Sequence, residues 1–331
     1  MESLLNVKNL VVHFGTAKKK LQAVRNISLS VDKGETLCVV GESGCGKSIT
    51  SLSIMGLLPP NGEISDGSIQ LNGQELVGKT EKELEKIRGN EISMIFQEPM
   101  TALNPTFTIG YQIREPLMIH RKMSKREATN EGIDLLDKVG IPDPKEKMTQ
   151  YPHHLSGGMR QRVMIAMALA CEPLLLLADE PTTALDVTIQ AQILDLIDDL
   201  KEQMSMGVIF VTHDMGVVAE VADRVMVMYA GEVVEVGDVD SIFNDPQHPY
   251  TQGLLASVPN VDDETQNLNT ISGSMPNLND RISGCRFHPR CPFAMEKCRE
   301  EAPPSFKISE NRESKCWLRE VKENVKSTSS S

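Results

Sequence analysis

The fold is decided by the stretch Gly41-Glu42-Ser43-Gly44-Cys45-Gly46-Lys47-Ser48, which matches the pattern G-x-x-x-x-G-K-[ST] in full. An apolar run precedes it at residues 36–40, and a run compatible with a helix follows at 49–55. A strand, a glycine loop and a helix in this order are the setting that a phosphate-binding loop requires. The glycines let backbone N–H groups turn towards a triphosphate, and the helix N-terminus adds its partial positive charge. The stretch therefore predicts a nucleoside triphosphate site, with Lys47 on the phosphates and the Ser48 hydroxyl on Mg²⁺.

Length and composition narrow the class of protein. The chain has 331 residues, enough for one large domain and a small one. Its longest apolar runs fall far short of the ~20 residues that span a bilayer, and residues 1–6 lack a signal-peptide pattern. We therefore expect a cytosolic chain, whose seven cysteines do not form disulfides. The net charge of −12 disfavours a nucleic-acid partner, because phosphate binding needs a basic face.

Polar residues follow four apolar runs of the sequence. The runs 36–40, 92–96, 174–178 and 207–212 are followed by the phosphate loop, Gln97, Asp179-Glu180 and His213, respectively. In an open α/β sheet, ligands bind outside the carboxyl ends of the strands. Each ending alone has an ordinary explanation, such as a surface histidine or a helix cap, but four in one chain favour a shared nucleotide site.

The chemistry of these side chains suggests their roles at that site. Asp179 can hold the hydration shell of Mg²⁺, and Gln97 can reach Mg²⁺ or the attacking water through its amide oxygen. Glu180 can polarise that water as a general base. His213 can contact the γ-phosphate and orient the water.

The remaining periodicity predicts an α/β core that carries a helical insert. Further strands are expected at 4–14, 24–31, 68–72, 224–229 and 232–236, and further helices at 79–88 and 186–203. Between about 104 and 170 the pattern is helical, with helices at 109–119, 125–139 and 163–170. Residues 17–20 are expected to form a turn.

A second anion-binding device follows from Ser156-Gly157-Gly158. A capping serine and two glycines at a helix N-terminus leave backbone N–H groups available to a phosphate. One chain thus carries two phosphate-binding devices. This predicts a head-to-tail dimer in which each nucleotide is shared between two subunits.

With these residues in hand, the chain resembles the ATPase subunit of an ABC transporter from residue 4 to about 245. Residues 41–48 match Walker A, Gln97 the Q-loop, 155–161 the signature, 174–180 Walker B, 184–186 the D-loop and His213 the switch histidine. Phe14 falls where the family stacks an aromatic ring on adenine. The resemblance implies ATP with Mg²⁺ as cofactor and ATP hydrolysis as activity, with Glu180 and His213 catalytic and Ser48, Gln97 and Asp179 on the metal. It assigns nucleotide contacts to Phe14, Gly41, Glu42, Ser43, Gly44, Cys45, Gly46, Lys47, Ser48, Gln97, Ser156, Gly157 and Gly158.

Finer features are similar to the oligopeptide and dipeptide importers of this family. They lie in residues 97–105, 181–190, 212–237 and 247–251, and the signature run 155–170 resembles that of the D-type ATPase. The resemblance implies a peripheral subunit at the cytoplasmic face of the membrane that energises substrate uptake. Its implied partners are an F-type ATPase, two transmembrane permeases and an extracytoplasmic substrate-binding protein. The alternative is a soluble ABC ATPase acting on nucleic acid or ribosomes. Long coiled coils, two ATPase cassettes in one chain or a basic face would support it, and the sequence shows none of these.

The expected fold is therefore an α/β P-loop NTPase of the ABC ATPase type with a helical subdomain and a small Cys-rich C-terminal module. We assign residues 1–245 to the nucleotide-binding domain, with the helical subdomain inserted at about 98–172. Residues 246–320 form the peptide-importer-type extension. Residues 321–331 are a low-complexity tail that we expect to be disordered.

The extension contains Cys285, Cys291, Cys298 and Cys316, spaced C-x₅-C-x₆-C-x₁₇-C. So short a segment cannot build a core of its own, which makes a structural metal reasonable. Zinc usually uses C-x₂₋₄-C pairs, whereas wider spacing is easier to wrap around a [4Fe–4S] cluster. The resemblance to D-type subunits also implies such a cluster at all four positions. We rank the iron–sulfur cluster first, zinc second and four metal-free cysteines third.

Overall fold

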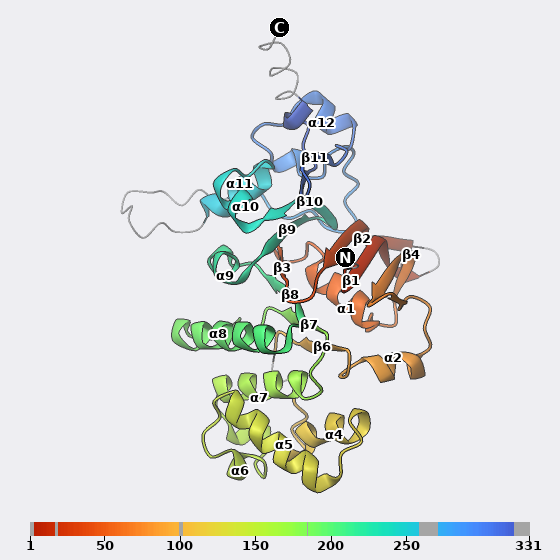
Figure 1. Ribbon diagram of the computed structural model, residues 1–331. Coiled ribbons are helices and arrows are strands. Elements are labelled where there is room, and N and C mark those ends of the chain that lie inside the picture. The colour runs from red at the N-terminus through yellow and green to blue at the C-terminus, as the bar shows by residue number, and fades with distance from the viewer. Residues whose placement is uncertain (1–2, 17–18, 99–101, 184, 258–270, 321–331) are drawn as a thin grey trace.

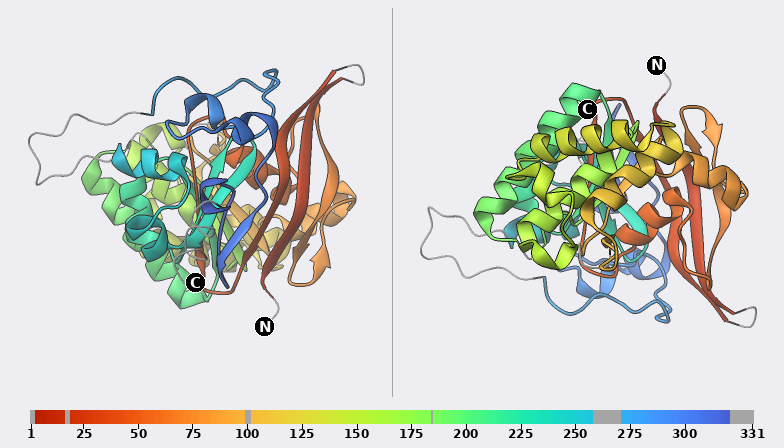
Figure 2. Two further views of the ribbon diagram at one scale, coloured as in Figure 1. Left: turned by 90° about the horizontal axis from the view of Figure 1, so that it is seen from above. Right: turned by 90° about the horizontal axis from the view of Figure 1, so that it is seen from below.

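The computed structural model describes residues 3–16, 19–98, 102–183, 185–257 and 271–320. Its centre is an eight-stranded sheet with the strand order β11-β12-β10-β9-β3-β8-β7-β6. A four-stranded antiparallel sheet, β2-β1-β4-β5, lies on one side of it, and helices cover the other side (Figures 1 and 2). The chain therefore has the predicted P-loop NTPase fold of α/β type, and its elements form three layers.

The central sheet is parallel where it meets the expected nucleotide site. Its strands are β3 (Thr36–Val40), β6 (Ile92–Ile95), β7 (Leu175–Asp179), β8 (Gly207–Thr212), β9 (Arg224–Tyr229), β10 (Glu232–Asp238), β11 (Phe306–Ser309) and β12 (Arg312–Ser314). The pairs β9-β3, β3-β8, β8-β7 and β7-β6 are parallel, with Val40 opposite Thr212 and Asp179 opposite Val211. This register brings the carboxyl ends of β3, β7 and β8 to one edge of the sheet.

Both faces of the parallel strands are buried, and alternate residues serve two different cores. Leu37 and Val39 pack with the antiparallel sheet and α1 (Lys47–Met55), whereas Cys38 and Val40 pack with the helices of the other side. A strand that is covered on both faces reads as a continuous apolar run, which is why β3 and β8 have the predicted bounds. Each fully buried aliphatic side chain contributes roughly 1.5–3 kcal/mol.

The antiparallel sheet carries the predicted adenine-stacking residue. It consists of β1 (Leu5–Thr16), β2 (Lys19–Val31), β4 (Gly62–Leu71) and β5 (Gln74–Glu75), and is followed by α2 (Glu81–Ile87). Phe14 lies near the end of β1, opposite Leu21 of β2. The prediction of a turn up to residue 20 was too long, because β2 already begins at Lys19.

The predicted helical insert forms one end of the molecule (Figure 1). It contains α4 (Ile109–His120), α5 (Lys125–Lys138), α6 (Pro144–Lys147), η1 (Pro152–His154) and α7 (Gly157–Leu169). The helix predicted from residue 163 begins earlier, at Gly157, because the Ser156 hydroxyl caps it by accepting a hydrogen bond from the Met159 N–H. Two more helices, α8 (Val187–Met204) and α9 (Met215–Val221), cover the sheet.

The C-terminal extension lies at the opposite end of the molecule and continues the central sheet (Figure 1). Helix α10 (Val239–Asn244) precedes it, and its own helices are α11 (Pro249–Ala256), η2 (His288–Arg290) and α12 (Glu296–Glu300). Strand β12 pairs with β10 of the core, and the buried rings of Tyr250 and Phe287 belong to the main hydrophobic core. A separate Cys-rich module is therefore not confirmed, because this segment uses the core of the whole molecule. The predicted disordered tail at 321–331 lies outside the described residues.

Candidate nucleotide site

The phosphate loop connects β3 to α1 and depends on its glycines. Gly41, Gly44 and Gly46 have φ values of +152°, +82° and +110°. A Cβ atom on Gly41 would lie 2.3 Å from the Met228 carbonyl oxygen, so no other residue fits there. The buried Lys47 ammonium closes the loop by donating to the carbonyl oxygens of Gly41, at 2.6 Å, and Glu42, at 3.2 Å.

The polar residues predicted at the strand ends lie together beside this loop. The Ser48 hydroxyl donates a hydrogen bond to Asp179 Oδ1 at 3.1 Å. The Gln97 amide donates to Glu180 Oε2 at 2.9 Å, and His213 Nδ1 lies 3.2 Å from Glu180 Oε1. The structure therefore brings together five side chains that the sequence placed after four different strands.

Glu180 is held in an unusual backbone conformation. Its φ of +47° is in the left-handed region, which is costly for a residue other than glycine. Thr183, which sequence reasoning missed, donates a further hydrogen bond to its Oε2 at 3.0 Å. Burial acts to raise the pKa of Glu180, but the hydrogen bonds from His213 and Thr183 outweigh it and lower that pKa. The carboxyl group therefore stays ionised at neutral pH, as a general base requires.

The pKa of Asp179 is shifted in the opposite direction from that of Glu180. Burial raises its pKa, and the nearby charge of Glu180 adds to this, while the hydrogen bond from Ser48 acts against both. A divalent cation beside the carboxylate would offset this cost, and a carboxylate next to a hydroxyl is a donor set that suits Mg²⁺. Ser48 and Asp179 therefore fit the expected metal.

A cavity of about 300 Å³ lies beside the phosphate loop. Its lining includes Phe14, Gln97, Glu180 and Leu278, together with the loop residues Ser43, Gly44, Gly46, Lys47 and Ser48. Gly41, Glu42 and Cys45 do not line it. The Phe14 ring packs against Gly62 so closely that a Cβ atom there would lie 2.7 Å from the ring. Phe14 is thus fixed at the mouth of the phosphate loop, where a base could stack on it.

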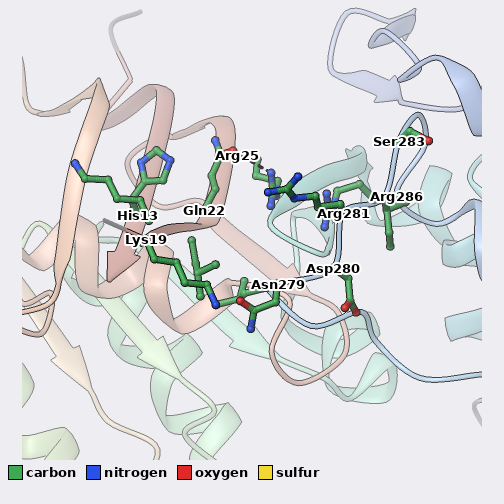
Figure 3. A pocket seen from close by; sticks show the side chains of 13 residues that line it. His13, Lys19, Gln22, Arg25, Asn279, Asp280, Arg281, Ser283 and Arg286 are labelled. Atoms are coloured by element: carbon green, nitrogen blue, oxygen red, sulfur yellow. Dashed lines mark hydrogen bonds between the residues drawn. The ribbon is translucent and has the colours of Figure 1, made fainter. Parts of the chain in front are cut away.

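A second, larger cavity of about 620 Å³ adjoins the first (Figure 3). One wall comes from β1 and β2 with His13, Lys19 and Arg25, and the other from residues 278–286 of the C-terminal extension. Leu278 borders both cavities. A segment of the extension therefore reaches the nucleotide cavity, which the sequence pattern did not indicate.

The extension also contacts the phosphate loop itself. The backbone N–H of Glu42 donates to the Tyr250 hydroxyl at 2.8 Å. The Glu42 carboxylate accepts two hydrogen bonds from the Arg290 guanidinium, at 2.6 and 3.0 Å. No spacing pattern could predict the second pair, because 248 residues separate its members.

The second predicted phosphate device lies apart from this cavity. Ser156, Gly157 and Gly158 form the N-terminus of α7 and are absent from the cavity lining. A Cβ atom on Gly158 would lie 3.3 Å from the Ile189 side chain of α8. Within one chain, the structure thus keeps the two phosphate devices separate.

The four cysteines of the extension share one region without forming a metal-ion site. The Cys285 N–H donates to the Cys298 carbonyl oxygen at 2.8 Å. Burial and, to a smaller extent, charge on the other cysteines raise the pKa of Cys285 to about 12 and that of Cys316 to about 11. Among the described residues, no three His, Cys, Asp or Glu side chains are grouped so that they could hold a metal ion. The predicted metal is therefore not supported by a ligand set.

Comparison with known proteins identifies the same parts of the chain. The family model described as "ABC transporter" matches residues 24–183, and that described as "Oligopeptide/dipeptide transporter, C-terminal region" matches 234–298. The oligopeptide transport ATP-binding protein AppD of Bacillus subtilis is 54% identical over 97% of this chain and 98% of its own length. The dipeptide transport ATP-binding protein DppD of Escherichia coli is 50% identical over 95% of this chain and 96% of its own.

Solved structures agree with the observed fold. The dimeric ATP-binding cassette MJ0796, in a post-hydrolysis state bound to ADP and Pi, matches with a TM-score of 0.64 at 29% identity. The match covers 71% of this chain and 98% of that one. No described helix is both long and apolar enough to cross a membrane. With relatives this similar over nearly their whole length, the chain belongs to the ABC transporter ATP-binding proteins that carry an oligopeptide/dipeptide transporter C-terminal region.

Proposed function

We propose that this chain is the ATP-hydrolysing subunit that energises a peptide importer at the cytoplasmic face of a membrane. As an ABC ATPase the chain binds and hydrolyses ATP. The observation that carries the proposal is the hydrogen-bonded convergence of Ser48, Gln97, Asp179, Glu180 and His213 beside the phosphate loop, where Ser48, Gln97 and Glu180 line one cavity. The match of the extension to the transporter C-terminal region favours peptides as the cargo class.

The geometry supports a separate task for each side chain. The loop N–H groups and Lys47 bind the phosphates, while Phe14 stacks on the base. Mg²⁺ held by Ser48, Asp179 and Gln97 would neutralise charge on the transferred phosphoryl group. Glu180 accepts a proton from the attacking water. His213 Nδ1 lies 3.2 Å from Glu180 Oε1, and His213 orients both Glu180 and that water.

A permease partner is supported by exposed apolar side chains on the helical insert. Phe107 and Tyr111 stack with ring centroids 4.5 Å apart and are each 43% exposed. Met118 and Ile119 of α4 are also exposed. Such a patch marks an interaction site, and α4 begins a few residues after the run that contains Gln97. Docking there would link membrane partners to the nucleotide cavity.

The importer role is tested by coexpression with two candidate permeases and a peptide-binding protein. The chain should then pellet with membranes and support ATP-dependent uptake of a labelled peptide, while Glu180→Gln should pellet but not support uptake.

The head-to-tail dimer should pair this chain with an F-type ATPase. A purified importer with two copies of this chain and no second ATPase would contradict that pairing, and a chain that binds ribosomes instead would contradict the importer role.

We also propose that Cys285, Cys291, Cys298 and Cys316 hold a structural [4Fe–4S] cluster. Support comes from the four thiols in one short segment, because a cationic group would stabilise the thiolates that burial and mutual repulsion disfavour at Cys285 and Cys316. The wide, uneven spacing of the four cysteines in the sequence is easier to wrap around a cluster than around a single zinc ion.

The cluster is tested by anaerobic purification. The protein should be brown, absorb broadly near ~400 nm and contain about four irons per chain. Cys298→Ser should lose the iron, whereas Cys171→Ser, a control cysteine that lies outside this segment, should keep it. Colourless protein with stoichiometric zinc, or with no metal, would contradict the cluster and leave the ATPase assignment intact.

A further inference from the structure

Glu42, in the phosphate loop, contacts two residues of the C-terminal extension. Tyr250 of α11 accepts the hydrogen bond of the Glu42 backbone N–H, and Arg290 of η2 forms a two-pronged ion pair with the Glu42 carboxylate. Paired hydrogen bonds between a guanidinium and a carboxylate are stronger and more directional than a single neutral one. Glu42 thus has both its backbone and its side chain fixed.

The Arg290 side chain is restrained by burial, by a hydrogen bond and by a contact with an aromatic ring. Its side chain is only 5% exposed, and its Nε donates to the Ser272 carbonyl oxygen at 2.9 Å. The guanidinium carbon lies 5.8 Å from the centre of the buried Tyr229 ring, within the range of a cation–π contact. The hydrogen bonds to Glu42 raise the pKa of Arg290 above its ordinary value. Arg290 therefore acts as a fixed cation and not as a mobile surface side chain, so its ion pair is worth more than an exposed one.

A fixed Glu42 matters because the phosphate loop is otherwise costly to order. Its glycines have many conformations to lose, and ordering them on binding would weaken nucleotide affinity. The Glu42 carbonyl oxygen is also an acceptor of the Lys47 ammonium, so the position of Glu42 affects the main phosphate-binding cation. In addition, an unpaired Glu42 carboxylate next to the loop would repel a triphosphate.

We propose that Arg290 is a positioning residue for nucleotide binding, which acts through Glu42 by fixing the phosphate loop and by neutralising its one carboxylate. The inference rests on the ATP site described above. Arg290 touches neither the cavity nor the reacting atoms, and lies between Cys285 and Cys291 in the chain. The conformation of the cysteine-containing segment is thereby connected to the affinity for ATP.

The test is a double-substitution cycle on the full chain, with affinity for MgADP measured by calorimetry and unfolding measured without nucleotide. Arg290→Gln should weaken MgADP binding roughly five- to tenfold, because it leaves the Glu42 carboxylate unpaired. Arg290→Gln combined with Glu42→Gln should recover most of that loss, because the repelling charge is gone. In the assembled importer, Arg290→Gln should raise KM for ATP and change kcat at saturating ATP by less than about twofold.

The matched control is Arg121→Gln, which breaks an ion pair with Glu172 far from the site and should leave the affinity unchanged. The proposal would be overturned if the double variant bound MgADP as weakly as Arg290→Gln does, or if Arg290→Gln bound it with wild-type affinity. Arg290 would then be a structural residue only. If Arg290→Gln does not fold, Arg290→Met, which also removes the charge and keeps the length of the side chain, replaces it, and wild-type affinity there would overturn the proposal equally. A wild-type chain that fails to bind MgADP would contradict the nucleotide site itself.

Discussion

The Glu180 carboxylate accepts hydrogen bonds from side chains of different segments of the chain. Gln97 follows β6, Thr183 follows β7, and His213 follows β8. Burial acts to raise the pKa of Glu180, but the hydrogen bonds from His213 and Thr183 lower it. Asp179, one residue earlier, has a raised pKa because burial dominates there. Two adjacent carboxyl groups thus differ in environment, which is the arrangement expected when one holds a cation and the other accepts a proton.

At this scale we predict that Glu180→Gln slows ATP turnover by roughly 10²–10⁴-fold, the usual cost of removing a positioned general base. Glutamine keeps the size of the side chain, so ATP affinity should remain within about twofold of wild type. Phosphate release and nucleotide binding measure the two effects. Glu172→Gln, which alters an exposed carboxylate far from the cavity, is the control. Normal turnover in Glu180→Gln would show that another group activates the water.

The elements differ in how far the sequence could predict them. Strands β3, β8 and β9 have the predicted bounds, because each is a buried, largely apolar run that is followed closely by glycine or a polar residue. The short helices α9 to α12 and the hairpin of β11 and β12 were not predicted, since they are too short for periodicity to show. The pairing of β12 with β10, like the contacts of Tyr250 and Arg290 with Glu42, depends on long-range packing that no local pattern encodes.

Helix α11 provides a prediction about pH. Its N-cap, His248, accepts the Tyr250 N–H at Nδ1 and is buried, which lowers the pKa of His248 to about 3. The unfolded chain takes up this proton below its ordinary pKa of about 6.5, whereas the folded chain does not until near 3. The stability contributed by neutral His248 is therefore complete above pH 6.5 and lost as the pH falls towards 3.

Between pH 7.5 and 5.5, where most carboxyl groups stay ionised, wild type should lose about 1.4 kcal/mol more unfolding free energy than His248→Asn. Asparagine can still cap the helix but does not titrate. Urea denaturation at the two pH values gives the difference. Equal losses in both proteins would mean that His248 titrates normally in the folded chain.

At the scale of the whole molecule, one chain contains two phosphate devices that do not meet. The phosphate loop, Gln97 and Glu180 border one cavity, while the Ser156 cap lies at the N-terminus of α7, outside it. The cassette MJ0796, which shares the fold, was solved as a dimer. A second subunit in head-to-tail orientation would supply the missing anion site to each nucleotide, and so complete two sites at once.

We therefore predict ATP-dependent association between this chain, carrying Glu180→Gln to prevent turnover, and its partner ATPase. Light scattering should show a dimer with MgATP and separate subunits with MgADP. Ser156→Arg should abolish the dimer, because the new side chain would fill the anion site at the start of α7. Ser124→Arg is a closely matched control: Ser124 also caps a helix of the insert, accepting the Glu127 N–H at 3.3 Å as Ser156 accepts the Met159 N–H at 3.3 Å. Both substitutions cost about 1 kcal/mol of capping energy, so a dimer lost in both would reflect damage to the insert, and a dimer kept in Ser156→Arg would contradict the shared site.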